Sequence, residues 1–396
     1  MRIPRRQLDA HARPFQADSA RAAIFLLSAS MGAGHDGAAR EISQRLQGMG
    51  YTTVLRDFLE SGPLKIGPAL RRSYEIQLRY FPSSYEATYR MWFKAPGLRA
   101  PLARFVAMLT GSTLLDWIGN ADPLVVVSTY PLATLALGEL KRTGRLSVPV
   151  ANFITDFGVH PLWVHPDVDL NLAVHETPAA CAACRSGRPS IACGPAVSDE
   201  FRIDRLPPRT EARARLGIHG PEPVVLIAAG SWGVGAVEET VRTVASGGRF
   251  VPVVACGTDR RLRTRLERVV ARQGIRAVVI GWTDDMPAVM AASDAVVENA
   301  GGLTGFEAMR AGVPVVSYRP IPGHGRENSA AMSAAGVVRV ARDAAELVVL
   351  LDALTARGPA RAAQVAAGAK IFGADPAQLV ADMVPAGAWR RSGTWA

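Results

Sequence analysis

The chain has 396 residues, of which 48% are hydrophobic and 20% charged, a balance typical of a globular protein with two or three domains and not of a long disordered chain. No apolar run approaches the roughly 20 residues of a membrane-spanning helix, and residues 1–20 lack the apolar centre of a secretory signal. The net charge of +10 favours anionic partners such as phosphates or an anionic membrane surface, but no long Lys/Arg run points to nucleic acid.

After residues 1–20, which we expect to be flexible, the chain begins an alternation of strand and helix patterns. Residues 22–28 form a continuous apolar run, typical of a buried parallel strand. A glycine-rich turn at residues 31–37 leads into a helical pattern over 38–48, and a second strand is predicted at 52–55. The glycine turn therefore lies at the carboxyl end of a parallel strand, which is where ligands bind in such folds.

Residues 64–105 interrupt this alternation with helical segments that are rich in basic and aromatic side chains. The aromatic ones are Tyr74, Tyr80, Phe81, Tyr85, Tyr89, Trp92, Phe93 and Phe105. Such interleaving is typical of a surface that binds an anionic membrane. The alternative is a helical insert whose aromatic side chains pack on the domain while its arginines face water.

The α/β pattern then resumes, with strands predicted at residues 123–128, 149–155 and 170–174 and a helix over 132–143. The pair Cys181 and Cys184, with Cys193 and His175 nearby, could indicate zinc. A single CxxC is weak evidence, however, and small buried thiols are the simpler interpretation, so we predict no metal site. A Pro- and Gly-bearing stretch over 193–208 is interpreted as a linker, which gives a first domain over residues 21–200.

The second half, residues 201–396, repeats the plan. Strands are predicted at 224–229, 250–255, 276–280, 295–297 and 314–317, the last closing the sheet, with a glycine turn at 230–235 after the first of them. We expect an α/β protein of two doubly wound domains with a cleft between them. The C-terminal helix is expected to pack back on the first domain.

Two nucleotide-binding patterns compete for the functional assignment. Residues 32–37 match G-x-G-x-x-G, and Asp57 lies where the dinucleotide fingerprint has its ribose-binding acid, so a nicotinamide-dependent enzyme is one hypothesis. Against it, His35 and Asp36 add bulk and negative charge where the pyrophosphate would approach.

The second pattern, residues 300–307, joins a strand end to a helix start. Gly301 and Gly302 let backbone amides approach a phosphate, Thr304 can cap the helix and donate its hydroxyl, and the helix dipole favours an anion. Glu307 is interpreted as an acceptor for two ribose hydroxyls, although its distance from Thr304 also fits a capping box.

A loop over residues 320–328 follows the last predicted strand. It presents Glu327 and Asn328, a carboxylate and an amide that suit the hydroxyls of a hexose. The alternative is an ordinary capped loop before a helix at Ser329.

The motifs at residues 28–35, 155–163, 299–307 and 322–328 together resemble the monogalactosyldiacylglycerol synthase and processive diacylglycerol glucosyltransferase family, relatives of MurG. The resemblance covers about residues 24–340. It implies a GT-B fold whose first domain binds the acceptor and faces the membrane, and whose second domain binds a UDP-sugar. It also implies an inverting transfer of a hexose without metal or cofactor to a lipid acceptor such as diacylglycerol, by a cytoplasmic enzyme peripheral on the inner face of the cell membrane.

The resemblance also implies roles for individual residues of this chain. Gly301, Gly302 and Thr304 would hold the diphosphate, Glu307 the ribose, and Glu327 and Asn328 the sugar. Gly230 and Ser231 would form a second glycine loop facing the phosphates, and Met286 would lie by the uracil. His324 departs from the family, which often has Gln there.

An inverting transfer needs a base that takes the proton of the acceptor hydroxyl. His35, at the first glycine turn, has a suitable pKa, although it could instead cap the following helix. Asp156 is the other candidate base, or it orients His35. Gly34, His160 and Trp163 are expected to shape the acceptor pocket. A soluble acceptor such as a natural product is the alternative that keeps the same fold and donor.

Overall fold

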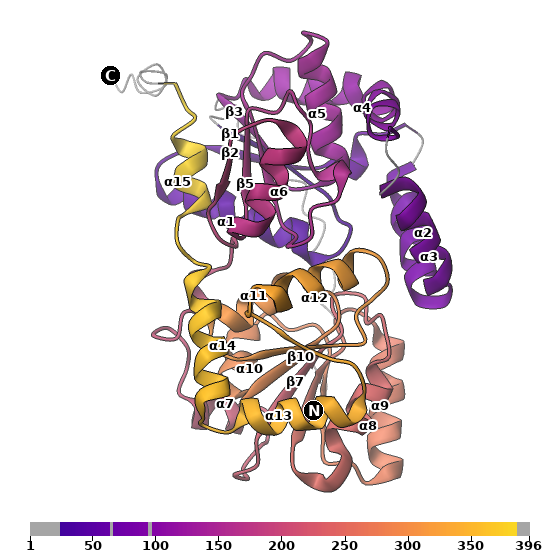
Figure 1. Cartoon of the computed structure of the whole chain (residues 1–396), viewed down its shortest axis with the longest axis vertical. Coiled ribbons are helices and arrows are strands. Elements are labelled where there is room, and N and C mark those ends of the chain that lie inside the picture. Colours follow the sequence, from indigo (N-terminus) through magenta and orange to yellow (C-terminus); the bar gives the residue numbers. More distant parts are fainter. Residues whose placement is uncertain (1–23, 64–65, 94–96, 386–396) are drawn as a thin grey trace, which may run out of the picture.

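The computed structural model describes residues 24–63, 66–93 and 97–385, so the N-terminus predicted to be flexible lies outside the described residues. Two α/β domains lie one above the other along the long axis of the molecule (Figure 1). Within the described ranges, no helix is long and apolar enough to span a bilayer. The predicted pair of doubly wound domains is confirmed.

The N-terminal domain is built on a six-stranded parallel sheet in the order β2-β1-β3-β4-β5-β6. Its strands are β1 (Ile24–Ser28), β2 (Thr53–Asp57), β3 (Val125–Ser128), β4 (Val150–Ile154), β5 (Leu170–Ala173) and β6 (Ser190–Ala192). The apolar run of β1 is entirely buried, as a central parallel strand requires. Helices α1 (Ala33–Gly48), α5 (Pro131–Arg142) and α6 (Glu176–Ser186) belong to this domain.

A helical insert lies between β2 and β3. It comprises α2 (Ile66–Tyr80), α3 (Pro82–Thr88), a π-helical turn (Tyr89–Phe93) and α4 (Arg99–Ala121). Helix α4 packs along α5, whereas α2 and α3 project from the domain and extend toward the other one (Figure 1). The term "insert" is used below for α2, α3 and the π-helical turn.

The C-terminal domain has a second six-stranded parallel sheet, in the order β12-β11-β10-β7-β8-β9. Its strands are β7 (Val224–Ala228), β8 (Val251–Ala255), β9 (Val278–Ile280), β10 (Ala295–Glu298), β11 (Val315–Tyr318) and β12 (Arg339–Ala341). The prediction that residues 314–317 close this sheet is wrong, because β12 pairs outside β11. With three residues and an exposed arginine, β12 has no apolar run that the sequence pattern could reveal.

The helices of the C-terminal domain precede and follow these strands. They are α7 (Arg209–Arg215), α8 (Val237–Ala245), α9 (Arg260–Gln273), α10 (Met286–Ala292), α11 (Leu303–Arg310), α12 (His324–Ala334), α13 (Ala344–Thr355) and α14 (Pro359–Lys370). The last helix, α15 (Pro376–Ala381), returns to the N-terminal domain and packs on α1. One apolar core consequently runs through both domains, from Ile42 of α1 to Phe306 of α11 and Val380 of α15.

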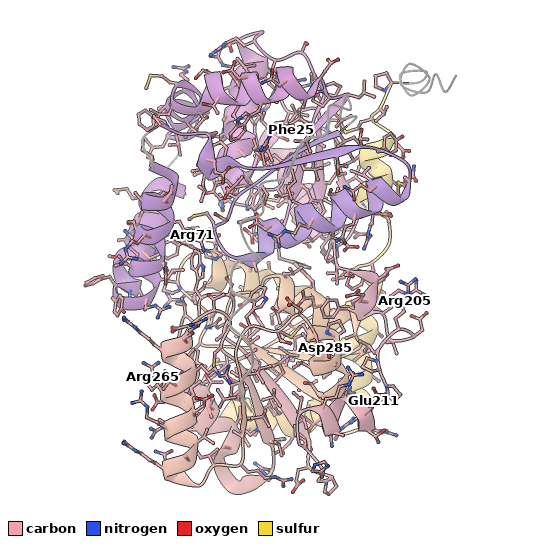
Figure 2. All side chains as sticks on the ribbon, turned by 180° about the vertical axis from the view of Figure 1, so that it is seen from behind. Phe25, Arg71, Arg205, Glu211, Arg265 and Asp285 are labelled. Carbon is pink, nitrogen blue, oxygen red and sulfur yellow. The ribbon has the colours of Figure 1, made fainter. Side chains whose placement is uncertain are left out.

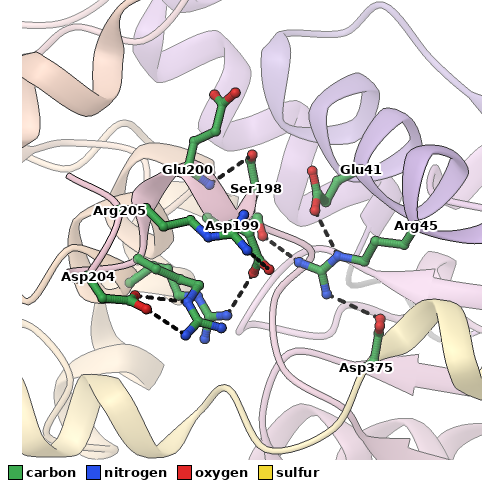
Figure 3. Close-up of polar contacts among 11 residues, drawn as sticks. Glu41, Arg45, Ser198, Asp199, Glu200, Asp204, Arg205 and Asp375 are labelled. Atoms are coloured by element: carbon green, nitrogen blue, oxygen red, sulfur yellow. Dashed lines mark hydrogen bonds and ion pairs between the residues drawn. The ribbon is translucent and has the colours of Figure 1, made fainter. Parts of the chain in front are cut away.

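Polar contacts hold the junction of the two domains around Arg45 of α1 (Figure 3). Its guanidinium donates to Glu41, to Asp375 just before α15, and to the carbonyl of Val197 in the linker. A second arginine, Arg310 at the end of α11, donates to the linker residue Asp199 at 3.0 Å. The chain crosses between the domains at the linker and again just before α15. Both crossing segments are thereby tied to α1 or α11, the two helices that begin at the cleft.

Candidate active site

A cavity of about 430 Å³ lies between the domains and is lined by both sheets and by the insert. Several of the predicted site residues line it: Gly34, His35, Asp156, His160, Gly230, Ser231, Gly302 and Thr304. Two glycine turns meet across this cavity, since the Ser231 hydroxyl lies against Gly32. Gly32 has a φ of 104°, a left-handed conformation that favours glycine and that begins α1.

His35 lies in the first turn of α1, and contacts at Nδ1 fix one side of its imidazole ring. Its Nδ1 lies 2.8 Å from the carbonyl oxygen of Thr129 and 3.2 Å from the Thr155 hydroxyl. A carbonyl oxygen can only accept, so this contact assigns the proton of the neutral ring to Nδ1. Nε2 is then an acceptor, and the described residues offer it no hydrogen-bond partner. Burial lowers the pKa of His35, which keeps the ring neutral, while the Asp156 charge opposes that shift.

Asp156, directly after β4, is held in place by both of its carboxylate oxygens. Oδ2 accepts from the indole Nε1 of Trp163 at 2.9 Å, and Oδ1 accepts from the side-chain amide of Asn328 at 2.9 Å. The carboxylate is not hydrogen-bonded to His35 but acts on it through its charge. This geometry suits an orienting and electrostatic role better than that of a base.

The predicted acceptor residues His160 and Trp163 are both almost fully buried. Burial lowers the pKa of His160 to about 3, so its ring is neutral where it lines the cavity. Trp163 does not line the cavity; it supports Asp156 from behind and lies 5.8 Å from the His35 ring. Trp163 therefore contributes to the site through another residue.

The second glycine motif forms the junction between β10 and α11. Gly302 is the N-cap of α11 and has no side-chain cap, so the predicted cap by Thr304 and the capping-box alternative for Glu307 are both wrong. The reason is that the helix begins at Leu303, which places Thr304 inside the first turn. Below the turn, the buried carboxylate of Glu298 accepts from the amides of Ala300 and Gly301. The amide of Gly301 is thus already used, whereas the start of α11 faces the cavity.

Glu307 lies one turn further along α11. Its side chain is partly exposed and, in the described part of the chain, has neither a hydrogen-bond nor an ion-pair partner. Removal from water raises the pKa of its carboxyl to about 7. Glu307 does not line the cavity, but no described protein group satisfies its carboxylate, which leaves it able to accept hydroxyls of a ligand that extends along α11.

The loop predicted at residues 320–328 is largely helical, because α12 begins at His324 after Gly323, whose φ is 67°. Glu327 and Asn328 lie in the first turns of this helix and contact the N-terminal domain. The Asn328 side-chain oxygen accepts from the amide of Gly158 at 2.8 Å. Neither side chain lines the cavity, whereas His324 does.

The insert contacts the start of α12 from the N-terminal domain. The Tyr89 hydroxyl donates to Glu327 at 2.7 Å, and the Glu86 carboxylate accepts from the amide of Gly323 at 2.7 Å. The Tyr85 hydroxyl lies 2.9 Å from Nδ1 of His324. These contacts draw the insert over the cavity and close it against the C-terminal domain.

The aromatic side chains that line the cavity from the insert were not predicted as site residues. Tyr74, Tyr85 and Tyr89 line it, and Tyr85 and Tyr89 also pack on Val234 and Ile321 of the C-terminal domain. The spacing of four residues between Tyr85 and Tyr89 was the available signal, since it places both on one helix face. The side chains of Trp92 and Phe93 lie outside the described residues.

The residues of the dinucleotide pattern have structural roles here. A Cβ at Gly37 would overlap the side chain of Leu303, so this glycine lets α1 approach α11 across the cleft. Asp57 accepts from the amides of Leu59 and Ser30. Met286, predicted beside the uracil, begins α10 and packs on the core without lining the cavity.

Comparison with known proteins gives matches over most of the chain. Residues 35–187 match the model of the monogalactosyldiacylglycerol (MGDG) synthase family. Processive diacylglycerol beta-glucosyltransferases of Bacillus cereus and Bacillus thuringiensis are each 26% identical to the chain, over 339 and 369 residues. The matches cover 84% and 91% of this chain and 85% and 92% of those proteins.

Solved structures give the fold. MurG of Acinetobacter baumannii aligns with a TM-score of 0.54 at 15% identity, covering 91% of this chain and 98% of that one. Os79 from O. sativa, in complex with U2F and trichothecene, aligns with a TM-score of 0.59 at 16% identity, covering 93% and 100%. The predicted GT-B fold and the predicted resemblance are confirmed, and the chain has glycosyltransferase homologues.

Proposed function

We propose, from the MGDG synthase family domain that this chain carries, that it is a glycosyltransferase that moves a sugar to a diacylglycerol-type lipid acceptor. The finer proposal is an inverting transfer of a hexose from a UDP-sugar at a membrane surface. The observation that carries it is the position of His35. His35 lines the same cavity as the start of α11, and its Nε2 has no hydrogen-bond partner among the described residues.

The chemistry follows from this arrangement. Nε2 of His35 takes the proton of the acceptor hydroxyl while that oxygen forms a bond to the anomeric carbon. The bond between this carbon and the UDP oxygen breaks, and its electron pair leaves with the diphosphate. Thr129 holds the proton on Nδ1, so that Nε2 keeps its lone pair, and the charge of Asp156 stabilises the imidazolium that forms.

The C-terminal domain would hold the donor. The start of α11 presents the positive end of a helix dipole, with Gly302 and Thr304 lining the cavity. Glu307, without a protein partner, would accept the ribose hydroxyls. Gly230 and Ser231 line the cavity from the other glycine turn.

The acceptor proposal rests on the apolar character of the N-terminal side. Leu70, Leu78, Leu132 and Phe153 line the cavity there, which suits a lipid better than a polar acceptor. A lipid does not leave its bilayer cheaply, since each exposed CH₂ costs about 0.8 kcal/mol. The enzyme must therefore come to the membrane surface.

A donor screen tests the proposal. Release of UDP from UDP-glucose, UDP-galactose and UDP-N-acetylglucosamine would be measured with and without diacylglycerol micelles. We expect one donor to release UDP faster when diacylglycerol is present. Equal release with a soluble alcohol acceptor would favour the soluble-acceptor alternative, and binding of NAD without binding of UDP would reject the proposal.

A further inference from the structure

Helix α9 of the C-terminal domain carries a stripe of arginines. Arg261, Arg265, Arg268 and Arg272 are spaced four, three and four residues apart, so they share one face of the helix over roughly 17 Å. All four are exposed, whereas Leu262 and Leu266 on another face enter the core. These four residues are called the arginine stripe below.

The stripe is poorly compensated by acids. Arg265 lies 3.4 Å from Glu238 of α8 and is 60% exposed. For Arg261, Arg268 and Arg272, the described residues supply no ion-pair partner. Like charges one helical turn apart destabilise a helix, so an anionic surface would relieve a repulsion that the fold itself leaves in place.

The stripe begins beside the insert. Asp259 caps α9 by accepting from the amides of Arg261 and Leu262. The same carboxylate accepts from Arg79, near the end of α2, at 2.5 Å. Figure 1 places α9 and the insert along one edge of the molecule, and Figure 2 shows Arg265 on that edge from behind.

The neighbouring turn of the insert exposes two aromatic side chains. Tyr80 and Phe81, directly after Arg79, are 62% and 59% exposed. Aromatic side chains next to arginines are the composition that settles at the headgroup level of an anionic bilayer. Tyr80 and Phe81 belong to the N-terminal domain and the arginine stripe to the C-terminal domain, and the Arg79–Asp259 pair joins the two.

We propose that the arginine stripe is a membrane contact of the C-terminal domain, which binds the same anionic bilayer as the insert. This rests on the proposed function, whose lipid acceptor requires a membrane surface. Both domains would then lie on one plane, with the insert closed over the cavity. Two contacts on one rigid surface also strengthen each other, because the second forms at a high effective concentration.

Vesicle flotation tests the proposal with four stripe arginines changed to Gln, a residue that keeps helix propensity. The matched control removes four exposed arginines elsewhere: Arg205, Arg339, Arg342 and Arg357. Each arginine that reaches an anionic surface contributes about fivefold in affinity. We expect the stripe variant to need at least about 25-fold more phosphatidylcholine–phosphatidylglycerol vesicles for half-maximal flotation, corresponding to two engaged arginines. The control variant should stay close to wild type.

Three other results would overturn the proposal: equal flotation of stripe variant and wild type, wild-type binding to pure phosphatidylcholine, or stripe-dependent binding to a DNA duplex without binding to vesicles. UDP affinity and turnover with detergent-dispersed acceptor should be unchanged in the stripe variant. Failure of the proposed function is separate, since it would appear as no UDP release from any donor by the wild type.

Discussion

The two domains follow one plan but differ in what the chain does after the second strand of each. In the C-terminal domain, β8 is followed by α9 and then by a third strand, β9, on the same side of β7, which gives the order typical of dinucleotide-binding domains. In the N-terminal domain, β2 is followed by the insert and α4, and the chain returns as β3 on the other side of β1. Helices that reach across the cleft thus replace an edge strand.

This difference shows how an insertion in one domain of such a fold can link the two sides of the cleft. The insert follows β2 at the point in the chain where the C-terminal domain, after β8, continues to α9 and β9. It contacts the N-cap of α9 and the start of α12. In the proposed function, an acceptor would therefore lie among residues that also hold the insert against the donor-binding domain. The C-terminal domain, with its regular strand order, contributes the junction of β10 and α11, where we propose that the diphosphate binds.

The largest expected effect concerns the N-terminal glycine turn. His35→Ala should lower kcat by about 10²–10⁴-fold, because a lost base slows the chemical step. UDP affinity, measured by calorimetry, should stay within twofold since His35 belongs to the other domain. If Asp156→Asn abolishes turnover while His35→Ala retains it, Asp156 is the base.

The corresponding residue of the C-terminal junction is Glu307. Glu307→Ala should weaken UDP binding by about 1–3 kcal/mol through the loss of charge-assisted hydrogen bonds to the ribose. Glu298 also lines the cavity, but one of its carboxylate oxygens already accepts from the amides of Ala300 and Gly301. Titration with UDP and with inorganic diphosphate separates the outcomes: the mutation should affect UDP, and an equal loss for diphosphate would remove the ribose assignment.

The raised pKa of Glu307 also predicts how stability depends on pH. Its carboxyl has a pKa near 7 when folded and 4.5 as the reference value for an exposed group, so the folded state binds the proton more tightly. This contribution to the free energy of unfolding is fully present below pH 4.5 and is lost as pH rises through 7. Thermal melts without ligand should show that Glu307→Gln removes this decline, and parallel profiles for both proteins would contradict the pKa.

Most strands of the two sheets, and the polar residues at their carboxyl ends, could be predicted from the sequence, because apolar runs and glycine turns are local signals. Sequence reasoning placed His35, Asp156 and Gly302 at one cavity, as the structure has them. It could not find the partners of those residues, such as the contact of Asn328 with Asp156, since these join segments far apart in the chain. For the same reason it left open whether the tyrosines of the insert form a membrane surface or pack on their own domain, and it did not predict that they contact the other domain.

A conservative change at Tyr89 tests the contact between the insert and the C-terminal domain. Tyr89→Phe removes the hydroxyl that donates to Glu327 and keeps the ring, so a loss of about 1 kcal/mol is expected, or about fivefold in KM for the UDP-sugar. Tyr80→Phe, on the exposed turn of the insert, is the matched control. A change in kcat alone would mean that Tyr89 acts on the reacting groups instead of on closure.

The smallest effect is expected at the far end of the insert, where Arg79 meets Asp259. Arg79→Ala removes the ion pair with Asp259 and the hydrogen bond to the Trp232 carbonyl. Because the Arg79 side chain is partly exposed, we expect about 1 kcal/mol or less, so KM for the UDP-sugar should rise two- to threefold. Asp259 keeps its bonds to α9, so the helix stays capped and the change acts on the domain contact alone. Arg72→Ala on the same helix, exposed and with no ion pair to a described residue, should leave KM unchanged. A rise in both variants would mean that α2 acts through its overall charge. A rise in Arg79→Ala alone would assign the effect to the contacts of Arg79 with the C-terminal domain.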